Sequence, residues 1–151
     1  MTFSQHVARD RWSAIYYVFL FLATLPLLTL FVGEWLVPQK QLPNAFLWFT
    51  HGAVLFQVVS TWFPEVKGWR TIIHRVLTGI SGIAMLPLVF ILATTSSLSG
   101  AVRFIAWIAL AFMVILLVIA LSNQKGYKWA LLLQIGYYAA FFVVLLAATY
   151  M

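Results

Sequence analysis

The stretch GAVRFIAWIALAFMVILLVIAL, residues 100–121, decides the class of this protein, because its only charged residue is Arg103. Crossing the hydrocarbon core of a membrane takes about 20 apolar residues. Over the whole chain, 64% of the 151 residues are hydrophobic and 8% are charged, and the mean hydropathy is +1.02. Soluble domains carry about 25% charged residues, because their surface faces water. The sequence therefore predicts an all-α integral membrane protein.

Four further stretches have the same apolar character, so we expect one domain that is a bundle of about five transmembrane helices. They cover about residues 13–36, 44–63, 70–93 and 129–150. The connections are short, so helices that follow one another are expected to be antiparallel neighbours. The first stretch has a basic entry, but it is too long for the core of a signal peptide and is expected to be retained.

The basic residues predict the orientation, since Lys and Arg are more frequent in cytoplasmic loops. With the N-terminus inside, the inner segments hold most of them: Arg9, Arg11, Lys67, Arg70, Arg75, Lys125 and Lys128. The outer segments hold only Lys40 and Arg103. We therefore expect the N-terminus inside and the C-terminus outside.

The predicted helix at 44–63 carries a polar stripe. Four residues recur at spacings of three and four and share one face: Thr50, Ala53, Gln57 and Ser60. Unpaired amides and hydroxyls are costly in lipid, so this face is expected to point into the bundle. Gln134 and Tyr138 share a face of the last helix and are candidates to bond with Gln57. The stripe predicts either a packed seam or the polar wall of a ligand or ion path.

His51 lies on the same predicted helix, and an ionisable residue inside a membrane span is a candidate functional residue. Glu34 ends the first predicted helix and Arg103 begins the fourth, so both are expected on the same outer side as His51. Together the three residues predict a polar cluster that titrates near neutral pH. The alternative is that Glu34 and Arg103 reach water independently.

A basic collar is predicted at the inner helix ends. Its members are Lys67, Arg70, His74, Arg75, Lys125 and Lys128. Basic residues near the membrane surface attract anionic lipid headgroups, each by about 1 kcal/mol. The collar therefore predicts either a general contact with lipid or a specific headgroup site.

The sequence contains few residues that could carry out catalysis or bind a metal or cofactor. There is no cysteine, which excludes disulfides and thiolate sites. His51 and His74 are expected near opposite membrane boundaries, so they cannot ligate one haem iron. The three acidic residues lie at different helix ends, and no catalytic motif is present. We predict no catalytic residue, no cofactor and no metal, and we do not expect nucleic acid as a partner.

Short motifs in the sequence resemble a known group of proteins. They are FPE at 63–65, HR at 74–75 opening a helix with glycine and proline, and LQIGYY at 133–138. The pattern resembles uncharacterised bacterial multi-helix membrane proteins related to the DRAM and Sfk families. The resemblance covers roughly the second helix to the C-terminus and implies a multi-pass protein of the bacterial cytoplasmic membrane. Members usually have six helices, and the family offers no established catalytic residues to carry over.

The leading functional hypothesis is a non-enzymatic membrane protein that binds lipid or a small apolar ligand, or that scaffolds partner helices. Its expected partners are membrane lipids and either a second copy of the chain or other membrane subunits. The alternative is a small transporter or channel subunit, with a polar path that His51 and Gln57 line on the second helix.

Overall fold

A computed structural model describes residues 11–63, 68–122 and 130–151, and every regular element in these ranges is a helix. The first is α2 (Arg11–Leu30), which continues without a break into a π-helical segment, η1 (Phe31–Leu36), and the short α3 (Val37–Gln39). The others are α4 (Asn44–Thr61), α5 (Trp69–Thr94), α6 (Gly100–Ser122) and α7 (Ala130–Tyr150). The all-helical class is confirmed, and the five predicted helices are present with ends that differ by a few residues.

Four helices of the described ranges are long and apolar enough to cross a membrane. They are Val18–Gln39, Trp69–Thr94, Gly100–Ala120 and Leu132–Tyr150. α4 has 18 residues, but its polar residues, among them Asn44, His51 and Gln57, make it less apolar than the others. These findings define a multi-pass membrane protein.

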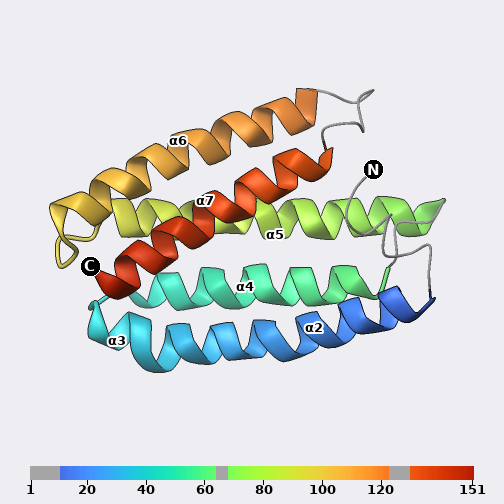
Figure 1. The fold of residues 1–151 in the computed structure, drawn as a ribbon, viewed down its shortest axis with the longest axis horizontal. Coiled ribbons are helices and arrows are strands. Elements are labelled where there is room, and N and C mark those ends of the chain that lie inside the picture. Colours follow the sequence, from blue (N-terminus) through green and yellow to red (C-terminus); the bar gives the residue numbers. More distant parts are fainter. Residues whose placement is uncertain (1–10, 64–67, 123–129) are drawn as a thin grey trace.

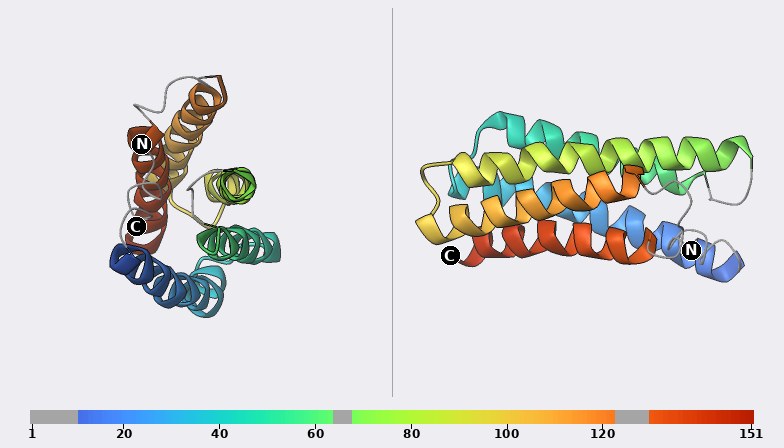
Figure 2. Two further views of the ribbon diagram at one scale, coloured as in Figure 1. Left: turned by 90° about the vertical axis from the view of Figure 1, so that its right-hand side faces the viewer. Right: turned by 90° about the horizontal axis from the view of Figure 1, so that it is seen from above.

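Consecutive helices run antiparallel and lie side by side (Figure 1). α4 packs between α2 and α5, while α7 packs against both α6 and α5 (Figure 2). We call the end of the bundle at which α2, α5 and α7 begin the N-terminal end. The opposite end, at which α5 and α7 finish, is the C-terminal end. α6 moves away from α5 towards the N-terminal end (Figure 1).

The π-helical segment precedes a proline. Pro38 has no N–H, and its ring collides with the carbonyl four residues earlier in a regular helix. Here the backbone hydrogen bond spans five residues instead of four, because the Val37 N–H donates to the Val32 carbonyl. With the extra residue in this turn, the helical stretch formed by α2, η1 and α3 reaches Gln39, beyond the predicted end at residue 36.

The apolar core lies in the C-terminal half of the bundle. Its most deeply buried side chains include Leu36, Phe46, Leu88, Leu92, Val102, Met113 and Val144. In the N-terminal half of the bundle, the described side chains of α4 and α5 that are buried are polar ones, such as Gln57, Ser60 and His74. No described side chain of α2 before residue 31 is buried. One end of the bundle is thus packed with hydrocarbon groups and the other with hydrogen-bonding groups.

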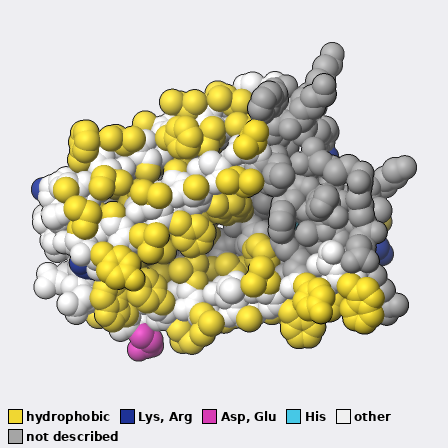
Figure 3. Space-filling view, viewed as in Figure 1, with side chains coloured by type: hydrophobic (Ala, Val, Ile, Leu, Met, Phe, Trp, Pro, Cys, Tyr) yellow, Lys and Arg dark blue, Asp and Glu magenta, His cyan; other side chains and the backbone are white. Residues whose placement is uncertain are grey.

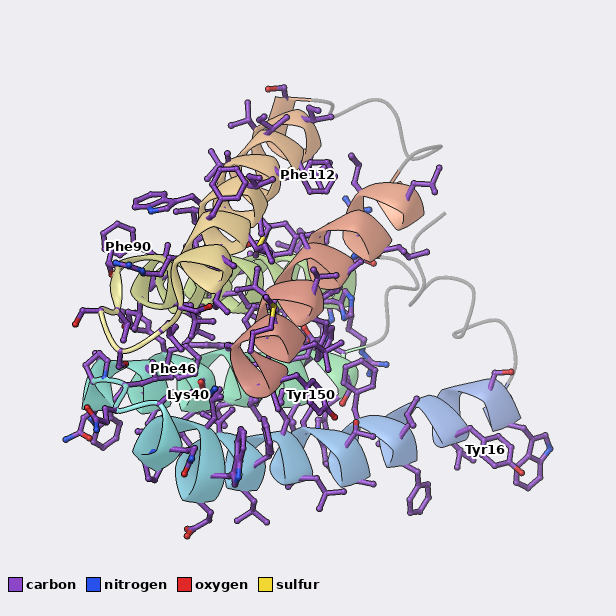
Figure 4. The ribbon with its side chains drawn as sticks, turned by 60° about the vertical axis from the view of Figure 1, so that its left-hand side comes forward. Tyr16, Lys40, Phe46, Phe90, Phe112 and Tyr150 are labelled. Atoms are coloured by element: carbon purple, nitrogen blue, oxygen red, sulfur yellow. The ribbon has the colours of Figure 1, made fainter. Side chains whose placement is uncertain are left out.

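The outer surface is apolar, as expected where lipid replaces water. Hydrophobic side chains spread over the described part of the visible face (Figure 3). Figure 4 shows the contrast with the interior, because Phe46 lies among the packed helices whereas Tyr16 projects away from them. Trp12, Trp62 and Trp69 are exposed at helix ends, where an indole favours the headgroup level.

Candidate functional site: the polar seam

Two hydrogen bonds cross directly from α5 to the backbone of α4. The Ser81 hydroxyl donates to the Ala53 carbonyl oxygen at 2.8 Å, and the His74 Nδ1–H donates to the Ser60 carbonyl oxygen at 2.9 Å. A carbonyl oxygen only accepts, so the proton of His74 is on Nδ1. Both side chains are buried, with 2% of Ser81 and 5% of His74 exposed. We call this contact between α4 and α5, together with its bonds to α7, the polar seam.

His74 satisfies a carbonyl that the end of α4 leaves available. The regular helical partner of the Ser60 carbonyl is the N–H of residue 64, which is a proline and has no N–H. Within the turn, the Phe63 N–H donates to Ser60 at 3.1 Å. His74 supplies a further donor to the same oxygen. The proline therefore ends α4. Because it has no N–H, the Ser60 carbonyl oxygen remains available to accept the bond from His74.

α7 joins the seam through two neighbouring tyrosines. The Tyr137 hydroxyl donates to the Gly82 carbonyl of α5 at 2.6 Å, and the Tyr138 hydroxyl donates to the Gln57 Oε1 of α4 at 3.3 Å. The predicted bond between Tyr138 and Gln57 is therefore confirmed. Gln134 is partly buried one turn before Tyr138 and bonds to no other residue that the structure describes. Three helices are thus held together near the middle of the bundle.

The stripe predicted on α4 faces the interior, as expected. Thr50, Gln57 and Ser60 are buried, with exposed fractions of 4%, 8% and 0%. The Thr50 hydroxyl donates to the Phe46 carbonyl at 2.9 Å, and the Ser60 hydroxyl donates to the Gln57 carbonyl at 2.7 Å. The two hydroxyls bond to their own helix, so this part of the stripe is a packed contact.

A matching stripe on α5 was not identified from the sequence. Its polar members are Thr71, His74, Thr78 and Ser81. Their spacing of three, four and three is the one that identified the face of α4. The same test, applied to α5, would have found it. His74 had instead been assigned to the basic collar because of its basic neighbours in sequence.

His51 lies outside the polar seam, which corrects its assignment to the ligand-binding set. Its side chain is exposed, its Nδ1–H donates to the Leu47 carbonyl at 2.9 Å, and its ring lies 6.5 Å from that of Trp48. One residue turns a helix by about 100°, so the neighbour of inward-facing Thr50 points elsewhere. His51 and Gln57 therefore do not line one common path.

The predicted outer cluster is not assembled. Glu34 and His51 are exposed and Arg103 is partly buried, and no described residue forms a hydrogen bond with the Nε of Arg103. No hydrogen bond or ion pair joins any two of these three described residues.

One residue predicted for the basic collar, His74, lies elsewhere in the structure. His74 is buried in the polar seam rather than directed to headgroups. Arg70 and Arg75 are exposed, and the Arg70 guanidinium lies 5.6 Å from the centre of the Trp69 ring. Lys67, Lys125 and Lys128 lie outside the described residues.

The helical fold and the polar seam define a multi-pass membrane protein whose buried polar groups connect three helices. Across the described residues, no group of three or more His, Asp or Glu side chains is placed to hold a metal ion. No family model, curated protein or solved structure matches the chain. The resemblance to proteins related to the DRAM and Sfk families therefore stays a prediction, and function is argued from the residues themselves.

Proposed function

We propose that this chain is a non-enzymatic five-helix protein of a bacterial cytoplasmic membrane that associates with partner transmembrane helices. The observation that carries the proposal is the exposed histidine on α4, His51. Lipids are the general partners of the apolar surface. The specific partner is either a second copy of the chain or another membrane subunit.

α4 is the fifth membrane span in this proposal, because it packs along α5, which is long enough and apolar enough to cross. The excess of Lys and Arg in the segments at the N-terminal end favours a cytoplasmic N-terminus. Alkaline phosphatase fused after Met151 is therefore expected to be active, since this reporter folds only outside the cytoplasm. Activity of a cytoplasmic reporter at Met151 would exclude this orientation.

The outward face of α4 has the residue spacing of a surface that packs against another helix. Asn44, Trp48, His51 and Leu55 are all exposed and recur at spacings of four, three and four, which places them on one stripe. No described residue bonds to the Nε2 of His51, and a polar nitrogen in hydrocarbon costs free energy. A neighbouring helix with a polar group removes that cost. Gly52 beside His51 has open space around its Cα, which permits a close approach.

The test is the mass of the native particle extracted with its lipid in polymer nanodiscs. Native mass spectrometry is expected to find assemblies heavier than the 17.1 kDa chain. His51→Leu is expected to shift the population towards the single chain. Thr24→Leu is the matched control, because Thr24 is exposed on α2 and bonds only to the Leu20 carbonyl of its own helix.

Two results would contradict association through α4. One is a wild-type particle that contains a single chain and lipid only, which would favour the lipid-binding hypothesis. The other is an equal shift with His51→Leu and Thr24→Leu, which would show that the face of α4 has no special role.

A further inference from the structure

Two buried threonine hydroxyls in α5 have no hydrogen-bond partner among the described residues. Seven of the nine described threonines donate to a carbonyl three or four residues earlier, which is the usual way a helix accommodates this side chain. The exceptions are Thr71 and Thr78, whose hydroxyl oxygens are buried and unbonded. A buried polar atom without a partner is rare in folded proteins and indicates a ligand, a water or strain.

Position 78 of α5 faces between α4 and α7. His74 and Ser81 of α5 bond to α4, while Gly82 accepts a bond from α7. At about 100° per residue, position 78 lies between these two directions, and position 71 is two turns earlier on the same side. Thr78 therefore lines the interior that α4, α5 and α7 share, and Thr71 lies on the same face of α5 nearer the start of the helix.

Other incompletely bonded polar groups belong to the same interior. The Gln57 Oε1 accepts from Tyr138, but its amide nitrogen donates to no residue in the described ranges. Gln134 stands one turn from Tyr138 towards the N-terminal end and likewise bonds to no described residue. The groups gathered here are hydroxyls and amides, which donate and accept without carrying charge.

Fewer of the described apolar side chains are deeply buried at this end of the bundle. The deeply buried apolar side chains, such as Leu88 and Val144, belong to the C-terminal half. Towards the N-terminal end α6 separates from α5 (Figure 1), and no described side chain of α6 after Met113 is buried. Thr78 is about 14 Å along α5 from Trp69, which is well inside a membrane span.

We propose that the N-terminal half of the interior between α4, α5 and α7 is a hydrated site that takes water and small uncharged hydrogen-bonding molecules. Thr78 and the Gln57 amide are its binding groups, Thr71 extends the same polar face along α5, and we expect entry from the N-terminal end of the bundle. Water inside a membrane span is stable where several polar groups bond to it. The site is independent of the outward face of α4.

The absence of cysteine from the sequence makes this site directly testable. Single cysteines replace Thr78 and, on the facing helix, Gln57, and N-ethylmaleimide, itself small and uncharged, is added to membrane vesicles. A thiol reacts as its thiolate, which forms only where water is present, so we expect both positions to react at least about tenfold faster than lipid-facing or dry positions. Ile80→Cys is the lipid-facing control and Leu88→Cys the dry, buried one.

The rates decide the proposal. Thr78→Cys and Gln57→Cys reacting as slowly as Leu88→Cys would overturn it, provided that gel filtration shows folded protein. Two variants on different helices guard against a folding defect in one of them. A charged methanethiosulfonate reagent applied to either face of the vesicles then gives the direction of entry. Faster reaction from the face that holds the C-terminal end of the bundle would contradict the proposed opening.

Discussion

Phe46→Ala is expected to lower the free energy of unfolding by about 3–5 kcal/mol, the range seen when a buried aromatic side chain is truncated. Phe46 is completely buried, with 0% of its side chain exposed, and it packs at the C-terminal end of the bundle (Figure 4). Within a membrane, helices gain little from the hydrophobic effect, so the loss comes from van der Waals contacts around the cavity. Unfolding by SDS in mixed micelles measures the change.

Phe104→Ala provides the matched control for Phe46. Phe104 is 66% exposed on α6, so detergent or lipid replaces the deleted ring and no cavity forms. We expect less than about 0.5 kcal/mol from this change, as for surface substitutions in general. Equal losses for the two variants would mean that the apolar core is not where the structure has it.

His74→Leu is expected to cost about 0.5–1.5 kcal/mol, the net contribution of one hydrogen bond, because the Ser60 carbonyl keeps the Phe63 N–H as a second donor. The variant removes the donor to the Ser60 carbonyl, and Pro64 cannot replace it because proline has no N–H. The end of α4 then keeps its packing against α5 but loses this hydrogen bond to it. The same SDS titration measures this loss.

Two companion variants separate the hydrogen bond from the shape of the side chain. His74→Asn keeps a donor close to the position of Nδ1 and is expected to recover part of the stability. His51→Leu makes the same chemical change on an exposed histidine that bonds within its own helix, so its effect on the isolated chain should be small. If His74→Asn and His74→Leu are equally destabilising, the bond to Ser60 is not what stabilises the seam.

Much of the architecture was predictable from the sequence alone. Long apolar runs in a chain with 8% charged residues leave lipid as the only adequate solvent. In lipid, a spanning segment must satisfy its own backbone, so the runs had to be helices. The inward face of α4 followed from the same reasoning, because Thr50, Gln57 and Ser60 share a stripe that lipid would penalise. The bond from Tyr138 to Gln57 was predicted on this basis and is confirmed.

The candidate site was predictable only in part. Helical periodicity identifies which residues share one face of a helix, but not which helix packs against that face. His74 looked like a member of a basic collar, because Arg70 and Arg75 surround it in sequence. Its position is decided by the Ser60 carbonyl, which becomes available only when α4 and α5 lie side by side. His51, in contrast, looked like an interior residue because the segment around it is apolar, and its outward direction depends on where α5 packs.

Hydropathy and helical periodicity by themselves determined that this is a bundle of membrane helices and which face of α4 is buried, because solvation by lipid acts on each segment separately. Only the tertiary structure decided which polar groups meet. It placed His74 and Ser81 against α4, turned His51 outwards and left the hydroxyls of Thr71 and Thr78 without a partner in the described part of the chain. The physical reason is that a hydrogen bond between helices depends on their register and rotation, which no single segment encodes.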